Sequence, residues 1–331
     1  MSVSLDRRLI GVALLALLLV VALGFGYYLV FREKQEGETG SQRELEVATV
    51  RVGVLPVIDS LPYHIAVVEG LDREHGLSLE IVVFPSARAR DDAFIAGGLD
   101  AIMTDLVGAM LLRDRGANLT IVLSKHATFY LVVSPKLAEQ VGGMRDLPNY
   151  VKTIAISYGT VIDFTLHKML AENNLDPQLF EIRDIRVIVE RFTAVLEGRV
   201  DAAVLPEPWG PLAQTRGARI VYSITIPIVV LAIDPSRIDV STAERLAVLV
   251  IEASRLYRSD TEKYRSILED PARIGVPREF AGWWVPRDLI SPRYAFTGVD
   301  GTVFSEVARW VYDKGLVKRL YSEAELVLKR S

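Results

Sequence analysis

Short apolar runs and helix-like segments alternate along this chain, and the alternation restarts halfway. The first round covers residues 50–124, and the second covers residues 153–222. Such alternation is typical of parallel strands whose connecting helices cover the sheet. The chain has 331 residues, of which 50% are hydrophobic, so it is long enough to build two cores. We therefore predict an α/β protein with two Rossmann-like units.

An internal repeat supports the two units. The segment GGLDAIMTDLVG (97–108) resembles EGRVDAAVLPEPWG (197–210), and an Arg-Gly-Ala triplet follows each of them. Asp100 and Asp201 are as far apart as the two triplets are. We expect both units to follow one plan: a helix, a glycine, Asp-Ala, a strand, a loop, a second helix and a second strand.

Two apolar strands fall outside this rhythm, at residues 130–134 and 228–234, and a proline follows each. We predict that one strand carries the chain out of a first lobe and that the other carries it back. The first lobe would contain residues 47–134 and 233–331, and the second would contain residues 135–232. Ligands of open α/β sheets lie beyond the carboxyl ends of the strands. The predicted fold class is thus α/β, with two Rossmann-like lobes, a two-strand hinge and a ligand cleft between the lobes.

The N-terminal segment has the pattern of a membrane anchor or an export signal. Residues 9–31 carry no charge, and two arginines precede them. A spanning helix needs about 20 apolar residues, more than the core of a secretory signal. We expect a transmembrane anchor, and a cleaved signal peptide is the alternative because residues 22–24 fit a cleavage site. Residues 1–8 would be cytoplasmic and 32–46 a polar linker. The remainder would lie at the extracytoplasmic face of the membrane, or in the periplasm after cleavage.

Composition argues against several classes of function. The net charge is -4 and no basic block occurs, which argues against a general nucleic-acid binder. The chain has no cysteine, and its four histidines show no metal-binding spacing, so we expect no metal and no cofactor. Residues 155–159 approach a hydrolase nucleophile elbow, but the only later histidine, His167, lies in the next predicted helix. We therefore expect no catalytic residues.

Polar and aromatic side chains follow the predicted strands of the first lobe. The candidate ligand-binding residues there are Asp59, Tyr63, Ser86, Arg88, Thr104, Asp105 and His126. A hydroxyl and free N–H groups at a helix start can hold an anion, and an acid at a strand end can face a cleft. The alternatives stay open: Asp59 and Ser86 are equally typical of helix caps, Arg88 of a solvated surface, and His126 of a structural histidine.

The second lobe has its candidates in two loops. Ser157, Tyr158 and Thr160 lie between a strand and a helix, where their polar groups could hold a ligand. Glu207 and Trp209 follow a buried strand in the segment Pro-Glu-Pro-Trp, so the carboxylate could face the cleft and the indole could stack on a ligand. The alternatives are a simple helix cap in the first loop and, in the second, a helix start with Trp209 filling the lobe.

The order of these segments resembles a known family. RVGVLPVIDSLPYHIAVVEGL (51–71), EHGLSLEIVVFPSARARDDAFIAGGLDAIMTDLVGAMLL (74–112) and VDAAVLPEPW (200–209) are similar to substrate-binding proteins of ABC importers. The group that it resembles most serves nitrate, sulfonates, taurine and thiamine pyrimidine precursors, and the similarity covers roughly residues 48–325. It implies a class II periplasmic-binding-protein fold that closes on a ligand and delivers it to a separate permease and ATPase. Many relatives carry a lipid on a cysteine, which this chain lacks.

Together these observations predict the extracytoplasmic solute-binding component of an ABC importer. The expected cargo is a small organic solute, sulfonate-like or like a pyrimidine or thiamine precursor. The expected partners are the ligand, the permease and ATPase subunits and, through the N-terminal helix, the membrane, with no nucleic acid and with the chain a monomer. The alternatives are a membrane-tethered ligand sensor that acts through a partner, and an enzyme on the same fold.

Overall fold

The computed structural model describes residues 47–260, 262–274, 296–297 and 299–328. The account below concerns this part of the chain, which falls in the compact unit Val47–Ser331. The predicted anchor and linker lie outside the described residues. No helix within the described ranges is long and apolar enough to cross a membrane.

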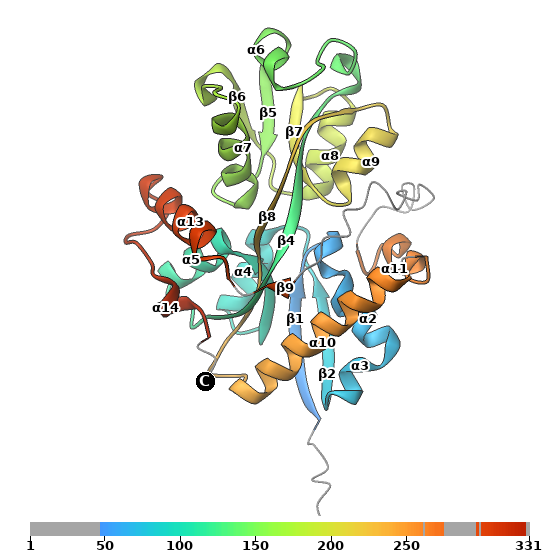
Figure 1. Cartoon of the computed structure of the whole chain (residues 1–331), viewed down its shortest axis with the longest axis vertical. Helices are drawn as coiled ribbons and strands as arrows, with labels where there is room; N and C mark the ends of the chain where they lie inside the picture. The colour runs from blue at the N-terminus through green and yellow to red at the C-terminus, as the bar shows by residue number, and fades with distance from the viewer. Residues whose placement is uncertain (1–46, 261, 275–295, 298, 329–331) are drawn as a thin grey trace, which may run out of the picture. The chain divides into compact units, whose positions relative to one another are not determined.

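A single mixed sheet runs through the described unit, in the order β2-β1-β3-β8-β4-β7-β5-β6, and β9 pairs with β4 (Figure 1). Its strands are β1 (Ala48–Val54), β2 (Leu77–Val83), β3 (Ala101–Asp105), β4 (Thr120–Val133), β5 (Thr153–Ile156), β6 (Glu181–Asp184), β7 (Ala202–Pro206), β8 (Arg219–Ile233) and β9 (Phe296–Thr297). β1 pairs in parallel with β2 and β3, and β5 pairs in parallel with β6 and β7. The alternation in the sequence therefore predicted two parallel groups of strands correctly.

The two central strands are longer than the sequence suggests. β4 and β8 pair antiparallel along most of their length, and both pass from one group of parallel strands to the other (Figure 1). The sequence predicts separate short strands here because Lys125 and His126 interrupt the apolar run of β4. The structure absorbs the interruption with a register shift between these two residues, so the ladder continues beyond them. β4 and β8 are the hinge strands of the two lobes.

Helices cover the sheet in both groups. The first lobe, built on β1 to β3, has η1 (Ile58–Ser60), α2 (Leu61–Glu69), α3 (Leu71–Glu74), α4 (Ala87–Ile95) and α5 (Leu106–Asp114). The second lobe, built on β5 to β7, has η2 (Pro135–Leu137), η3 (Met144–Asp146), α6 (Leu147–Tyr150), α7 (Val161–Glu172), η4 (Pro177–Leu179), α8 (Ile188–Leu196) and α9 (Trp209–Thr215). The C-terminal part adds α10 (Val240–Ser259), α11 (Arg265–Glu269), α13 (Gly301–Asp313) and α14 (Glu323–Leu326). α10 packs on α2 and α13 packs on α5, so both of these C-terminal helices lie on the first lobe.

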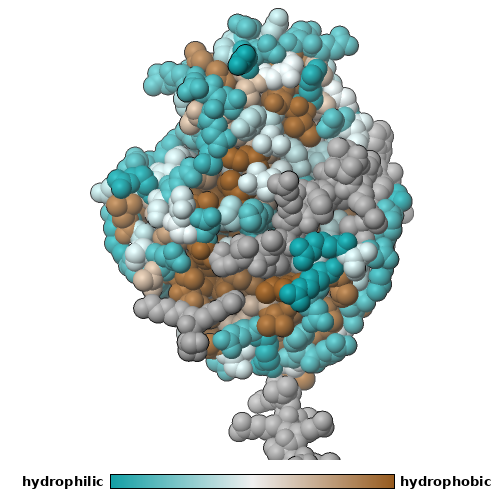
Figure 2. Space-filling model, in the orientation of Figure 1, coloured by the Kyte–Doolittle hydropathy of each residue, from teal (hydrophilic) through white to brown (hydrophobic). Residues whose placement is uncertain are grey.

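The helices bury apolar residues at helical spacing. In α8, Ile188, Phe192 and Val195 are all buried, as the recurrence of apolar residues predicts. In α4 the buried residues are Phe94 and, in place of a hydrophobic residue, Arg90. On the face shown in Figure 2, hydrophilic residues dominate the outer regions and hydrophobic residues gather nearer the middle.

The two lobes repeat one another at a constant offset of 101 positions. Ala101 opens β3 and Ala202 opens β7, and α4 and α8 match at the same offset. The repeated aspartates have a common structural role, because Asp100 accepts a hydrogen bond from Arg51 N (2.9 Å) and Asp201 accepts one from Lys152 N (2.8 Å). Each aspartate thus joins the end of a loop to the start of its lobe's first strand.

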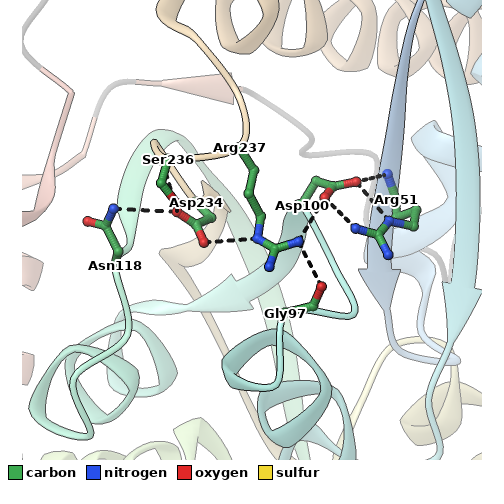
Figure 3. Close-up of polar contacts among 7 residues, drawn as sticks. All are labelled: Arg51, Gly97, Asp100, Asn118, Asp234, Ser236 and Arg237. Atoms are coloured by element: carbon green, nitrogen blue, oxygen red, sulfur yellow. Dashed lines mark hydrogen bonds and ion pairs between the residues drawn. The ribbon is translucent and has the colours of Figure 1, made fainter.

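The first lobe adds a network around its aspartate. Figure 3 shows Asp100 between the guanidinium groups of Arg51 and Arg237, and Arg237 also reaches Asp234 and the carbonyl of Gly97. Burial alone would raise the pKa of Asp100, but the hydrogen bonds from Arg51 outweigh it and lower the pKa. This network lies at the amino ends of the parallel strands and stabilises the lobe.

Candidate functional site

Two adjoining cavities lie where the parallel strands of both lobes end. The inner cavity has a volume of about 60 Å³ and the outer cavity one of about 370 Å³. Both are lined from both sides, since Ala87 and Asp105 come from the first lobe and Ser157, Thr160 and Arg186 from the second. The outer volume is typical of a site for a small organic molecule. We call the two cavities together the cleft.

Most of the residues predicted from the sequence line this cleft. The lining residues among them are Asp59, Ser86, Arg88, Thr104, Asp105, Ser157, Tyr158 and Thr160. They follow different strands of both lobes, and the fold brings them together because parallel strands end at the same edge of a sheet. The remaining predicted residues, Tyr63, His126, Glu207 and Trp209, are described residues that line neither cavity.

The structure contradicts the stacking role predicted for Trp209. The indole is 0% exposed, and its ring packs edge-on against Phe192 with the ring centroids 5.0 Å apart. Pro208 caps α9 and Trp209 is the first residue of that helix. The indole therefore fills the second lobe and leaves no face for a ligand, which is the structural alternative that the sequence left open.

The loop around Glu207 and Trp209 instead joins the two lobes. Trp209 Nε1 donates a hydrogen bond to the carbonyl of Pro56 (2.8 Å), and the carbonyl of Glu207 accepts one from Ile58 N (3.1 Å). The Glu207 carboxylate faces the hinge strand, where Tyr130 Oη donates to it at 2.7 Å. The side chain is buried among protein groups and lines neither cavity, so a ligand contact of Glu207 stays a prediction.

Tyr63 and His126 also lie away from the cleft. Tyr63 belongs to α2 and is buried, and its burial raises the pKa of its hydroxyl. His126 lies in β4 opposite Pro227 of β8. The sequence placed both residues after strands, but it did not show the direction in which they point. We assign neither of them to the ligand site.

A buried arginine forms the base of the first lobe's side of the cleft. Arg90 is 1% exposed and donates to the carbonyl of Met103 (2.6 Å), to Thr104 Oγ1 (2.8 Å) and to Asp91 Oδ1 (2.9 Å from Nε). Burial raises the pKa of Asp91, and the charge of Arg90 opposes that rise. The carboxylate of Asp91 thus balances the guanidinium beside it.

The second lobe has an arginine at the matching place. Arg191 lies 101 positions after Arg90, is also 1% exposed, and donates to the carbonyls of Val204 (2.9 Å) and Ile185 (2.7 Å). Within the described ranges no carboxylate forms a hydrogen bond with it. Burial lowers the pKa of Arg191 to about 10, so the group stays positively charged at neutral pH. The inner cavity is therefore lined by a buried cation whose hydrogen-bond acceptors are neutral.

Two carboxylates of the first lobe are accounted for by protein groups. Asp59 forms a close ion pair with Lys125, and both side chains are almost fully buried. Asp105 caps α5 by accepting a hydrogen bond from Gly108 N at 2.8 Å. Burial raises the pKa of Asp105 to about 6, so this carboxyl group carries its proton more readily than an ordinary aspartate.

The second lobe presents a tightly held loop to the cleft. Asp184 accepts a hydrogen bond from Tyr158 N (2.9 Å), and Asp163 accepts one from Gly159 N (3.0 Å). Thr160 caps α7 by accepting a hydrogen bond from Ile162 N. These contacts fix the start of α7 at the edge of the cleft. We call residues 157–160 the cleft loop.

The arrangement is suited to binding. Arginines line the cleft from both lobes, whereas of its aspartates Asp59 is paired with Lys125, Asp91 with Arg90, and Asp105 caps a helix. No group of three His, Asp or Glu side chains that could hold a metal ion occurs among the described residues. Arginines outnumber aspartates among the lining residues.

Sequence reasoning missed the arginines that determine this charge. Arg90, Arg186 and Arg191 line the cleft, and Lys125 supports it from the hinge strand. An arginine in a predicted helix is usually solvated, so neither Arg90 nor Arg191 was selected. The internal repeat carried a signal, because it aligns the two arginines at the same offset as Asp100 and Asp201.

Comparisons with known proteins agree with this geometry. The chain is similar to a protein of Brachyspira hyodysenteriae that is named an ABC transporter periplasmic binding protein, with 25% identity over 197 residues, which is 56% of this chain and 57% of the relative. The alignment therefore spans little more than half of that relative's length.

Solved structures share the fold. The alkanesulfonate-binding protein SsuA from Xanthomonas axonopodis, bound to MOPS, has a TM-score of 0.68 and 18% identity over 86% of this chain and 99% of its own. The periplasmic aliphatic sulphonate binding protein SsuA from Escherichia coli has a TM-score of 0.67 and 18% identity over 84% of this chain and 96% of its own. The two-lobed fold of periplasmic binding proteins is thus shared by this chain. The NMT1-like family model matches residues 43–269, about two thirds of the chain, and the chain therefore belongs to the NMT1-like family.

Proposed function

We propose that this protein is the extracytoplasmic solute-binding component of an ABC importer, and that it captures a small organic anion in the cleft. The observation that carries the proposal is Arg191. It is a buried cation, it lines a cavity formed by both lobes, and its hydrogen-bond acceptors among the described residues are backbone carbonyls. Asp184 stabilises this charge from a distance without a hydrogen bond to it, and an anionic ligand in contact with the guanidinium would lower the cost of burial further.

The rest of the cleft favours an anion over a cation. Arg88, Arg186 and Arg191 line it, and Arg88 and Arg186 also pair with Asp92 and Asp184, two aspartates that line neither cavity. Of the lining aspartates, Asp59 is paired with Lys125 and the pKa of Asp105 is raised. α4 and α7 also begin at residues that line the cleft, and the start of a helix favours negative charge.

An organic anion fits better than a bare inorganic one. Apolar side chains such as Val57, Phe129 and Ile188 share the inner cavity with the arginines, so a ligand can place its charge near Arg191 and its carbon atoms against these groups. A relative in fold, the Xanthomonas protein, is named for alkanesulfonates. We therefore favour a sulfonate or carboxylate over a pyrimidine, since the buried Trp209 offers no stacking surface.

Delivery and anchoring belong to the same proposal. Residues 9–31 form a charge-free run of spanning length, which supports a membrane tether or an export signal. The lobes would contain residues 47–134 with 233–331, and residues 135–232, so that β4 and β8 carry the chain between them. A permease would receive the solute when the lobes part.

A binding screen tests the proposal. Protein expressed without the N-terminal 46 residues is analysed by native mass spectrometry for a co-purified ligand. Its melting temperature is then measured with alkanesulfonates, small carboxylates, nitrate, pyrimidines and primary amines. A ligand that binds only the folded state raises the melting temperature by mass action. We expect a rise with sulfonates or carboxylates that depends on concentration, and no rise with amines.

Two other outcomes would be decisive. A rise with amines or neutral pyrimidines alone would contradict the anion preference while keeping a solute receptor. No bound mass and no rise with any class would contradict solute capture and favour a tethered protein that acts through a partner. Copurification of the full chain with a permease separates an importer component from such a sensor.

A further inference from the structure

The lobes also touch outside the cleft, between α7 of the second lobe and α13, which packs on α5 of the first lobe. Lys168 Nζ lies 2.7 Å from Glu306 Oε1, and Lys314 Nζ lies 2.9 Å from His167 Nε2. Beneath these polar contacts, Trp310 meets Phe164 edge-on with the ring centroids 5.4 Å apart. We call this set of contacts between α7 and α13 the clasp.

The clasp is connected to the cleft loop through one aspartate. His167 Nδ1 lies 2.9 Å from the backbone carbonyl oxygen of Asp163, on the preceding turn of α7, and 3.0 Å from Asp163 Oδ1. The other carboxylate oxygen of Asp163 accepts the hydrogen bond from Gly159 N, and Gly159 lines the outer cavity. Lys314, His167 and Asp163 thus form a chain of contacts that runs from the surface of the first lobe to the ligand site of the second.

The direction of each hydrogen bond follows from the donors available. The ammonium of Lys314 has donors only, so it requires the lone pair of His167 Nε2 as acceptor. The imidazole must then be neutral, with its proton on Nδ1, where it donates to the backbone carbonyl of Asp163. In an imidazolium both nitrogens are donors, so protonation removes the acceptor and places two positive charges side by side.

We propose that the clasp is a pH-sensitive latch, which holds the lobes together while His167 is neutral, and which releases Lys314 when His167 takes a proton. The proposal rests on the two-lobed fold and on the contacts of α7 with α13, and it does not depend on the identity of the solute. Domain closure about a hinge is a common conformational change in two-lobed proteins.

The other charged groups near His167 set the size of the effect. On its own helix these are Asp163, Lys168 and Glu172, and on α13 they are Glu306, Asp313 and Lys314. Glu306 is paired with Lys168, and that ion pair is not altered by the proton on His167. Protonation therefore removes one polar contact between the lobes and leaves a second one, together with the packing of Trp310 on Phe164. A partial shift towards open molecules is expected.

The absence of cysteine makes the latch measurable. Tyr150→Cys on α6 and Val248→Cys on α10 place one spin label on each lobe, at side chains that are 47% and 51% exposed. Pulsed electron paramagnetic resonance on the full chain in detergent gives the distribution of distances between the labels. It is recorded without added solute from about pH 8 to about pH 5, the range in which histidines change charge.

We expect the ratio of open to closed molecules to rise about three- to tenfold as the pH falls, the size expected for the loss of one hydrogen bond between the lobes. His167→Gln keeps an acceptor for Lys314 but cannot take up the proton, so its ratio should stay constant. Lys314→Met should be more open at pH 8 than the unaltered chain and should lose most of the pH response. Lys314→Met changes only a partly exposed side chain, so it serves as the test variant if His167→Gln folds poorly.

A matched control separates the latch from a general effect of acid. His75 also pairs with a charged side chain, Glu252 at 2.9 Å, but both residues lie on helices of the first lobe. His75→Gln should therefore keep the full pH response. The proposal is wrong if His167→Gln responds as the unaltered chain does, or if the distances in the unaltered chain do not change with pH. Distances that do not change with pH would result if the protonated His167 lost its contact with Lys314 and formed one with Asp313 instead.

Discussion

The two lobes bury an arginine at the same place, and they balance its charge differently. In the first lobe Asp91 follows Arg90 and forms hydrogen bonds with it, whereas in the second lobe Phe192 follows Arg191. Both guanidinium groups donate to the carbonyl of the strand residue 13 positions later. The scaffold is therefore common to both lobes, and the residue after the arginine determines which arginine hydrogen-bonds to a neighbouring carboxylate.

The different partners of Arg90 and Arg191 indicate different roles for the two lobes. Arg90 with Asp91 is a structural pair that supports Thr104 and the end of β3. The hydrogen-bond acceptors of Arg191 in the described part of the chain are carbonyl groups, so its guanidinium is not paired directly with a carboxylate. A duplicated fold can thus keep its geometry in both halves while only one half supplies the recognition charge.

The largest expected effect is on stability in the first lobe. Arg90→Met leaves the carboxylate of Asp91 in a buried site without its partner, so the free energy of unfolding should fall by about 3–5 kcal/mol. Arg191→Met leaves only carbonyl acceptors and should cost about 1–3 kcal/mol. Urea unfolding at neutral pH measures both. In the double variant Arg90→Met with Asp91→Asn, much of the lost stability should be recovered. Equal losses for Arg90→Met and Arg191→Met would contradict the difference inferred between the two lobes.

The second effect is on binding, and it belongs to the other lobe. The test uses an anion that raises the melting temperature of the unaltered chain. Arg191→Met should weaken the binding of this anion by about thirtyfold or more, because a buried charge pair is lost. Arg183→Met is the matched control, since Arg183 is exposed, pairs with Glu181 and does not line the cleft. Isothermal titration calorimetry gives the two dissociation constants. Unchanged binding by the Arg191 variant would show that the charge of this lobe does not recognise the solute.

The third prediction concerns pH and Asp105. Its pKa is raised to about 6 by burial, so the folded state holds the proton more tightly than the unfolded state does. Its contribution to stability therefore falls as the pH rises from about 4 to about 6, and it stays low above that range. Asp105→Asn keeps a good helix cap and lacks the titration, so the variant should exceed the unaltered chain by about 1–3 kcal/mol at pH 7 and match it near pH 4.

A second helix cap provides the control of opposite sign. Hydrogen bonds from Thr242 lower the pKa of Asp239 at the start of α10, so its contribution to stability is present above the ordinary pKa and is lost as the pH falls. Asp239→Asn should therefore be the less stable form at pH 7. Urea unfolding at four pH values between 4 and 7.5 follows both variants. Parallel pH profiles for the two would contradict the assignment of burial as the cause at Asp105.

The smallest effect tests the part that the lobes share. Gly116 and Gly217 have φ angles of +88° and +87°, and each ends the helix before a hinge strand. A Cβ has open space at Gly116 and lies 3.8 Å from Pro135 at Gly217, so alanine costs mainly backbone strain. Each substitution to alanine should lower the free energy of unfolding by about 1–2 kcal/mol. A large difference between the two losses of unfolding free energy would show that the two lobes differ in energy at positions where their backbones match.

The fold was largely predictable because it depends on local patterns. Alternating apolar runs identify parallel strands and helices, and the repeated Asp-Ala segments identify the two lobes. The long strands β4 and β8 were predicted as separate pieces, since polar residues such as Lys125 and Thr128 hide a continuous strand. Their partners lie on the opposite hinge strand, at a sequence distance that no local pattern reveals.

The candidate site was predictable in position more than in chemistry. Strand ends selected Asp105 and Thr160, which line the cleft, because sheet topology brings such loops to one edge. The same rule also selected Trp209, since it cannot tell which side of a loop faces the cleft. It passed over Arg191, because a charged residue on a predicted helix is normally exposed.

By itself, the sequence determined the α/β alternation, the repeat at a fixed offset and the absence of cysteine chemistry, because these depend on residue type and spacing alone. Only the tertiary structure decided that Trp209 fills a lobe, that Arg90 hydrogen-bonds to a carboxylate while Arg191 donates to backbone carbonyls, and that Lys314 reaches His167. Burial and charge balance depend on which distant groups share a neighbourhood, and packing sets that neighbourhood after the chain has folded.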